Sequence, residues 1–306
     1  MSLLLPRAQK STIDRANIFQ KLTGGLSHAA PGLAAMAAEQ LFVTVFRHKR
    51  PPREEAWAEG ASRFSVPSPH GDLAVWVWGN GPKTVLLVHG WAGRGLQLGA
   101  FVEPLVRAGY RVVAFDGPAH GESPGRRTNI FNLSEGLMAV ADAIGPLSGV
   151  IAHSLGTTAV LLAASRYGID PGRFVAISPM AHTRTMTGWY GQMTGFSPAV
   201  VEEMRTRLED SVGFCWDEIE PARLAASLGS HALVIHDRDD PELPASEGET
   251  LARAIPTAEF VVTEGLGHRR ILRDPEVVEI AAGFVARTSS ASDPTLLAHT
   301  NAASAA

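Results

Sequence analysis

Cysteine and excess positive charge are both nearly absent from this sequence. Its 306 residues contain one cysteine, Cys215, so neither an internal disulfide framework nor a thiolate metal cluster can form from this chain alone. We expect Cys215 to lie half buried beside Phe214 and Trp216, because thiols commonly pack as small hydrophobes. The formal net charge is -4, which leaves no positive field for a phosphate backbone. We therefore expect no nucleic-acid partner.

Long apolar runs are also missing. The first ten residues have only a short apolar run with no charged region ahead of it, unlike a secretory signal. The most apolar early stretch, residues 29–46, is interrupted by Pro, Gly and Glu and falls short of the ~20 apolar residues of a membrane-spanning helix. We expect a cytoplasmic protein. The basic residues 47–50 suit either a helix C-terminus packed on the domain or weak contact of this N-terminal helix with an anionic membrane surface.

Composition divides the chain into three parts. Residues 1–60 are Ala-rich and mainly helical in pattern, and we expect an N-terminal helical extension there. Residues 287–306 are Ser, Thr and Ala with almost no large apolar side chains, which predicts a disordered tail. Between them, residues 61–286 are expected to form one large domain, since 45% hydrophobic residues are enough for a sizeable core.

Short β-branched runs alternate with helical patterns across this central domain. Most of the runs are continuously apolar, as in strands that helices cover on both faces. The alternation predicts an α/β fold with a mostly parallel central sheet flanked by helices. Strands are expected at 74–78, 84–88, 111–115, 149–152, 174–177, 232–235 and 259–262, and helices at 96–108, 133–144, 157–167, 198–210, 247–254 and 275–286.

One strand of this sheet stops at a serine and continues directly into a helix. Residues 149–157 place Ser154 at this reversal, and a reversal so tight strains the central residue and requires small residues two positions before and after it. Ala152 and Gly156 meet that requirement. A serine at a helix start also commonly serves as an N-cap, and capping is the alternative role for Ser154.

The segment Ala152 to Gly156 resembles the nucleophile elbow of the α/β-hydrolase family, with Ala152 where Gly is usual. The resemblance covers roughly Phe64 to Val285. It implies the α/β-hydrolase fold with a short helical cap, and acyl transfer through a covalent intermediate on Ser154. It implies neither a cofactor nor a metal.

Acyl transfer also requires backbone N–H donors for the oxyanion, each worth about 3 kcal/mol. The resemblance assigns one to Leu155, directly after the nucleophile. His89-Gly90-Trp91, which follows the strand at 84–88, resembles the family's His-Gly-X oxyanion loop and implies Trp91 as the second donor, with its indole facing the acyl pocket. The loop lacks the Gly-Lys-Ser/Thr continuation of a phosphate-binding P-loop.

The serine hydroxyl requires a base, and the base requires a carboxylate. The family's order of serine, acid and histidine points to His268, in a loop after the last strand, although an exposed loop histidine is the alternative. Three aspartates follow the strand at 232–235. The family's spacing selects Asp240, Asp237 is the runner-up, and Asp239 is expected to be solvated or paired with Arg238.

The remaining motif residues are expected to support these groups. His89, His120 and His153 are predicted to brace loops through hydrogen bonds, and Asp116 lies in a turn similar to one that the family uses structurally. Residues 182–228 occupy the place where the family inserts a cap. Because the cap is rich in large apolar side chains, Trp189 is expected to contact substrate together with Trp91 and His153, favouring an apolar acyl or alcohol group.

These residues together predict a serine hydrolase that cleaves a carboxylic ester through Ser154, His268 and Asp240. Acyl transfer to an alcohol, and thioester, amide or carbon–carbon bond cleavage, use the same groups and stay open. A non-catalytic binding protein on this fold is the alternative of another class. Such proteins usually lack one member of the triad, whereas this chain has a candidate for each.

Overall fold

The computed structural model describes residues 7–287, with side chains from residue 17 onward. The chain forms two compact units, of which the first comprises residues 1–44 and 182–220 and the second residues 45–181 and 221–306. The tail predicted to be disordered lies outside the described residues, except for residue 287.

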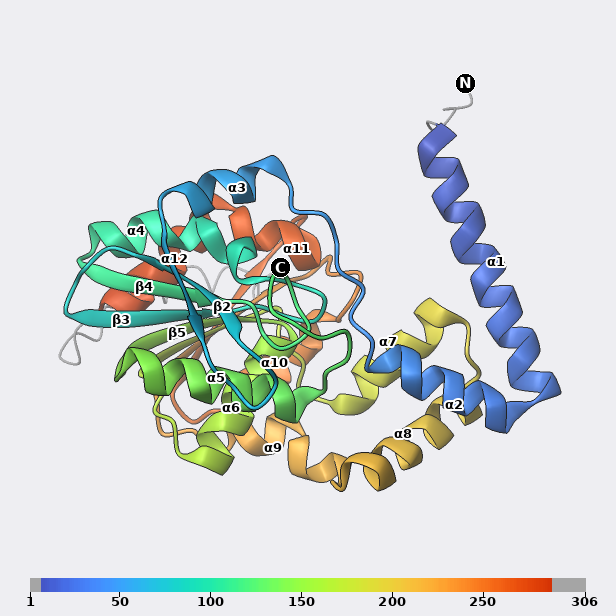
Figure 1. Ribbon diagram of the computed structural model, residues 1–306. Helices are drawn as coiled ribbons and strands as arrows, with labels where there is room; N and C mark the ends of the chain where they lie inside the picture. The colour runs from blue at the N-terminus through green and yellow to red at the C-terminus, as the bar shows by residue number, and fades with distance from the viewer. Residues whose placement is uncertain (1–6, 288–306) are drawn as a thin grey trace, which may run out of the picture. The chain divides into compact units, whose positions relative to one another are not determined.

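The second unit is built on one sheet of eight strands, in the order β1-β2-β4-β3-β5-β6-β7-β8 (Figure 1). β1 and β2 pair antiparallel, as do β2 and β4, and all other neighbours pair parallel. The expected mostly parallel sheet is therefore confirmed. The strands are β1 Ser62–Val66, β2 Leu73–Trp78, β3 Lys83–Val88, β4 Tyr110–Phe115, β5 Leu147–His153, β6 Arg173–Ile177, β7 Ala232–Asp237 and β8 Ala258–Thr263.

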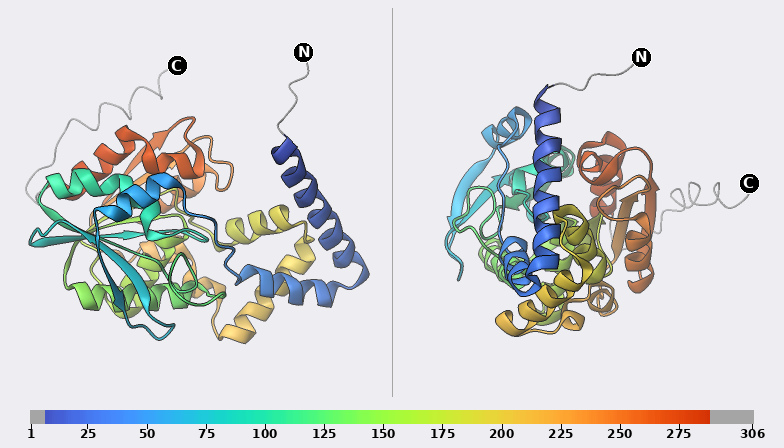
Figure 2. Two further views of the ribbon diagram at one scale, coloured as in Figure 1. Left: turned by 45° about the horizontal axis from the view of Figure 1, so that its top comes forward. Right: turned by 90° about the vertical axis from the view of Figure 1, so that its right-hand side faces the viewer.

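Helices cover both faces of this sheet, which explains why its central strands are continuously apolar. α4 and α12 lie on one face, and α5, α6 and α10 lie on the other (Figures 1 and 2). The side chains of Phe101, Ile151 and Phe284 are fully buried in the resulting core. The helices of this unit are α3 Pro52–Glu59, α4 Val102–Arg107, α5 Ile130–Ile144, α6 Leu155–Tyr167, α9 Pro221–Ala225, α10 Ala245–Ala254, α11 Gly267–Arg270 and α12 Pro275–Ala286.

Two details of this sheet and its helices differ from the sequence-based expectation. The helix expected at 96–108 begins as a 3-10 helix, η1 Gly95–Phe101, and becomes α-helical only in α4. A Cβ atom at Gly99 would lie 2.3 Å from the Trp57 ring, so η1 is where α3 packs closely. β1 was not expected, because all but its last residue are exposed and it has no apolar run.

The first unit joins the N-terminal helices to helices of the cap region. It contains α1 Arg7–Ala29, α2 Pro31–Phe42, α7 Thr183–Thr194 and α8 Pro198–Val212. α2 lies along α8 (Figure 2). The Tyr190 hydroxyl donates to the carbonyl oxygen of Ala38 at 2.8 Å, and Arg207 Nε lies 2.9 Å from Glu39 Oε2. Residues 7–44 thus share a unit with residues 182–220, which composition alone did not indicate.

The expectation for Cys215 is wrong, since its side chain is exposed. Its neighbour Trp216 takes the buried position instead. The Arg205 guanidinium lies 4.0 Å from the centre of the Trp216 ring, and the indole N–H donates to the Arg205 carbonyl oxygen at 3.1 Å. Trp216 is therefore fixed in place by Arg205, while Cys215 is directed to solvent.

The basic segment after α2 makes specific contacts within the second unit. The Arg47 guanidinium donates to the carbonyl oxygens of Ala119, Ser123 and Gly125, and Arg50 forms an ion pair with Glu122. These two side chains hold the loop after β4 in the structure. None of the helices within residues 7–287 combines the length and apolar character needed to cross a bilayer.

Candidate active site

Ser154 stands between the end of β5 and the start of α6 in a strained backbone conformation. Its φ is 52° and its ψ is -125°, a region that costs a non-glycine residue about 1–3 kcal/mol. Its main-chain N–H donates to the carbonyl oxygen of Ile177 at 2.9 Å, which anchors the turn to β6. The side chain makes no capping hydrogen bond to α6. The alternative role as an N-cap is therefore not the one that this serine has in the structure.

The small residues around Ser154 are required by close approach of the loop after β3. A Cβ atom at Gly156 would lie 2.5 Å from the carbonyl oxygen of His89, and one at Gly90 would lie 2.9 Å from the Ser154 Cβ. Real Cβ atoms do not approach so closely, so both positions need glycine. Ala152 is fully buried within β5. The loop that carries Trp91 therefore packs directly against the turn that carries Ser154.

Two main-chain N–H groups on the two segments that meet at Ser154 have no acceptor among the described residues. They belong to Leu155, the first residue of α6, and to Trp91, one residue after Gly90. The N–H of Leu155 is at a helix N-terminus, where the partial positive charge of the helix favours an anion. These are the two donors that the sequence assigned to the oxyanion.

Buried histidines hold the Trp91 loop, as predicted. His89 Nδ1 donates to the Gly90 carbonyl oxygen at 2.7 Å, and His89 Nε2 accepts the N–H of Gly117 at 2.9 Å. His120 Nε2 accepts the N–H of Ala92 at 3.0 Å. Burial lowers the pKa of His89 to about 4 and that of His120 to about 3, so both rings are neutral near pH 7 and able to accept these bonds.

Asp116 braces the loop after β4, which confirms its predicted structural role. Its carboxylate is fully buried and accepts the N–H of Gly95 at 2.8 Å and the N–H of Glu122 at 2.7 Å. Burial raises the pKa of Asp116 to about 6 despite these two bonds.

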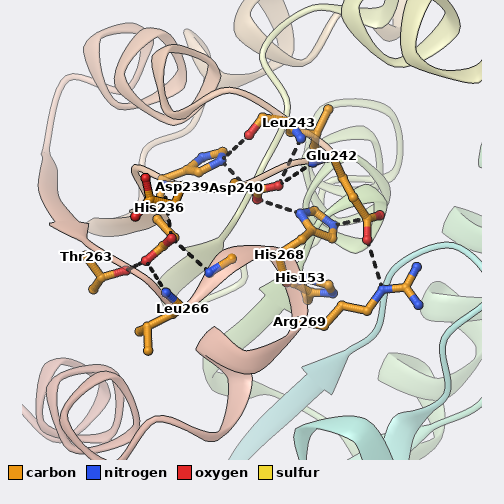
Figure 3. Close-up of polar contacts among 12 residues, drawn as sticks. His153, His236, Asp239, Asp240, Glu242, Leu243, Thr263, Leu266, His268 and Arg269 are labelled. Carbon is orange, nitrogen blue, oxygen red and sulfur yellow. Dashed lines mark hydrogen bonds and ion pairs between the residues drawn. The ribbon is translucent and has the colours of Figure 1, made fainter. Parts of the chain in front are cut away.

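Asp240, on the loop after β7, is paired with His268, which is buried in the short helix α11 and does not lie in a loop as predicted (Figure 3). His268 Nδ1 lies 2.7 Å from Asp240 Oδ2, and Asp240 Oδ1 accepts the N–H groups of Glu242 at 2.8 Å and Leu243 at 3.0 Å. His236 Nε2 lies 3.4 Å from the same Oδ2. Burial acts to raise the pKa of Asp240, but hydrogen bonds from His236 and His268 lower it well below its ordinary value. The carboxylate is therefore ionised.

The other two aspartates of this segment hold residues 265–267, which lead into α11, without contacting the His268 side chain. Asp237 accepts hydrogen bonds from the Thr263 hydroxyl at 2.7 Å and from the N–H groups of Leu266 at 3.1 Å and Gly267 at 2.8 Å. Asp239 accepts the N–H of Gly265 at 2.9 Å, while Arg238 pairs with Glu264 and not with Asp239. Of the two aspartates considered as the acid, Asp240 is the one that contacts the His268 side chain.

His153 links the serine turn to α11, the short helix that contains His268. Its Nε2 lies 2.9 Å from the carbonyl oxygen of His268, and the centres of the two rings are 4.7 Å apart. Because a carbonyl only accepts, Nε2 of His153 carries the proton. Burial lowers the pKa of His153 well below its ordinary value, which keeps the ring neutral. Ser154 is the next residue in the chain, yet no hydrogen bond joins its hydroxyl to His268 in the described structure.

The three residues predicted to contact substrate, Trp91, His153 and Trp189, lie in different parts of the structure. Trp91 is half buried, and its ring lies edge-on to His120 with 5.4 Å between ring centres. His153 is buried and bonded to the carbonyl oxygen of His268, and its contact with substrate stays a prediction. Trp189 belongs to α7 in the first unit, so its relation to Ser154 stays a prediction.

Sequence reasoning missed Glu242. Its Oε2 lies 3.9 Å from His268 Nε2, and its Oε1 lies 3.1 Å from Arg269 Nε (Figure 3). No motif includes this position, although it lies two residues after the acid. Within residues 7–287, no group of three or more His, Cys, Asp or Glu side chains is arranged to hold a metal ion.

Comparison with known proteins establishes the family. A family model described as the alpha/beta hydrolase family matches residues 85–281, more than half of the chain. The chain therefore belongs to the α/β-hydrolase family, and its fold is of this class.

Individual relatives are distant. The chain is 30% identical to a dihydrolipoyllysine-residue acetyltransferase component of the acetoin cleaving system of Pseudomonas putida, over 68% of this chain and 66% of that one. It is 30% identical to a serine hydrolase-like protein of Danio rerio, over 54% of this chain and 47% of that one. The chain thus spans less than two thirds of either relative. An esterase structure from Pyrococcus furiosus superposes with a TM-score of 0.58 at 20% identity, covering 79% of this chain and 96% of that one, and shows the shared fold.

Proposed function

We propose that this α/β hydrolase is a serine esterase that cleaves carboxylic esters with an apolar acyl or alcohol group. The observation that supports it best is the arrangement around the strained Ser154. The segments that meet at this serine carry two main-chain N–H groups without acceptors among the described residues, and the ionised Asp240 is paired with His268 in α11, which His153 ties to the serine turn.

The proposed reaction proceeds in two acyl-transfer steps. His268 Nε2 takes the proton of the Ser154 hydroxyl while Oγ bonds to the ester carbonyl carbon, and the resulting oxyanion accepts the N–H groups of Trp91 and Leu155. The intermediate collapses as the ester C–O bond breaks, and His268 returns the proton to the departing alcohol. Water then repeats the sequence on the acyl-enzyme, which releases the acid and restores Ser154. Asp240 keeps the Nδ1 proton in place throughout.

Acyl transfer is a second candidate, because one relative is named as an acetyltransferase component. In that reaction an acceptor nucleophile takes the place of water in the second step. Adding an alcohol acceptor to the ester assay separates the two. A transferase forms the new ester faster than free acid, whereas an esterase forms mainly acid.

A chain-length series of p-nitrophenyl esters tests the proposal, with the native protein and Ser154→Ala compared at equal concentration. We expect turnover by the native protein, none by the variant, and labelling of the native protein alone by a fluorophosphonate probe. His268→Ala is expected to abolish labelling while the circular dichroism spectrum is unchanged. Equal turnover by native and Ser154→Ala proteins, or failure of the probe to label the native chain, contradicts the proposal.

A further inference from the structure

The Glu242 carboxylate lies near Nε2 of His268, the ring nitrogen that faces away from Asp240. Nδ1 lies 2.7 Å from Asp240 Oδ2, whereas Nε2 lies 3.9 Å from Glu242 Oε2. The imidazole therefore stands between two carboxylates (Figure 3). Only the first is needed to orient the ring, so the second is available for another role.

Glu242 is held firmly where it stands. Its main-chain N–H donates to Asp240 Oδ1 at 2.8 Å, so the backbone of Glu242 is fixed by the same carboxylate that orients His268. Its Oε1 is bound by Arg269 Nε at 3.1 Å. The second oxygen, Oε2, is the one nearest to His268 Nε2.

The charge of Glu242 is only partly offset by Arg269. The Glu242 side chain is 23% exposed, whereas that of Arg269 is 60% exposed and better screened by water. Arg269 also binds the oxygen that is not nearest to the imidazole. We therefore expect the Glu242 carboxylate to act as a negative charge on a group placed next to His268 Nε2.

In the proposed reaction, the alcohol portion of the ester is the group that leaves from the position next to His268 Nε2. His268 Nε2 donates its proton to the departing oxygen, so the atoms attached to that oxygen lie within reach of Glu242. A positively charged alcohol portion would be stabilised there, and a negatively charged one would be repelled.

We infer that Glu242 determines specificity for the leaving group and favours esters of cationic amino alcohols over esters of neutral or anionic alcohols. The inference rests on the proposed esterase function and concerns the same site. It gives Glu242 a role in substrate selection that is separate from the orientation of His268 by Asp240.

Two esters with the same acyl group test this role. Butyrylcholine and 3,3-dimethylbutyl butyrate have nearly the same shape, but only the first carries a positive charge. We expect the native ratio of kcat/KM for the cationic over the neutral ester to fall roughly tenfold in Glu242→Gln, as one lost charge interaction across a partly exposed site implies. In the matched control Arg269→Gln the ratio is expected to rise, because the offsetting charge is removed.

The ratio separates specificity from a structural effect, since damage to the site lowers both rates together. Rates are taken per site labelled by a fluorophosphonate probe. A ratio unchanged in both variants, with labelling intact, overturns the role of Glu242 and leaves the esterase proposal standing. Absence of both labelling and turnover in the native protein overturns the esterase proposal and the inference together.

Discussion

The tautomer of His268 depends on Asp240 being a carboxylate, and Asp240→Asn tests this. Asp240 Oδ1 accepts two main-chain N–H groups, from Glu242 at 2.8 Å and Leu243 at 3.0 Å. An asparagine must keep its carbonyl oxygen toward these donors, which turns its NH2 group toward His268 Nδ1. Nδ1 then has to accept, the ring proton moves to Nε2, and Nε2 can no longer take the proton of Ser154.

The expected loss in kcat is about 10⁴-fold, the size known for the same exchange in a serine protease triad and equivalent to about 5 kcal/mol in activation free energy. The assay is kcat on p-nitrophenyl butyrate, with folding checked by circular dichroism. Asp237→Asn is the matched control, because Asp237 accepts four hydrogen bonds but does not touch the His268 side chain. It should cost stability with a much smaller loss in kcat. A folded Asp240→Asn protein with kcat within tenfold of native would refute this account.

Three further changes have defined outcomes. Gly156→Val places a Cβ 2.5 Å from the His89 carbonyl oxygen, so fluorophosphonate labelling should be lost, and normal labelling would contradict the close approach described here. Phe101→Ala removes a fully buried ring and should lower the free energy of unfolding in urea by about 3–5 kcal/mol. Burial lowers the pKa of His89 from 6.5 to about 4, so this one proton should lower native stability by up to about 3 kcal/mol as pH drops from 6.5 to 4, because the unfolded chain takes it up and the folded chain does not. His89→Gln should flatten that part of the curve, measured by urea unfolding at several pH values.

The parallel sheet and the serine turn were predictable because their signals are local. The apolar runs that became β3 to β7 are continuous since helices cover both faces of these strands, and that pattern needs no knowledge of distant residues. The turn at Ser154 is encoded in the same way, because the smallness of Gly156 follows from backbone atoms packed against it. The seven strands predicted from apolar runs were found with ends shifted by only one or two residues, whereas β1, which is mostly exposed, carries no such signal.

The choice of acid required the structure, because Asp237, the last residue of β7, and Asp240 are only three residues apart. Spacing favoured Asp240, and the contact with His268 Nδ1 agrees with that choice. Asp237 has a function that no motif suggests, since it binds the backbone of the loop that carries His268. The pairing of α2 with α8 also lay beyond sequence reasoning, because the two segments are far apart in the chain and joined by side chains such as Arg207 and Glu39.

Sequence motifs could not have identified Glu242. A motif identifies residues by what the reaction always needs, and the reaction needs a nucleophile, a base, an acid and oxyanion donors. Glu242 is none of these, and its importance depends on a backbone path that turns its carboxylate toward His268 Nε2. Asp240 itself fixes this backbone path, because its Oδ1 accepts the Glu242 N–H. In the proposed mechanism, Asp240 orients His268 and also places the Glu242 charge beside the leaving group, so orientation and specificity are coupled in one short loop.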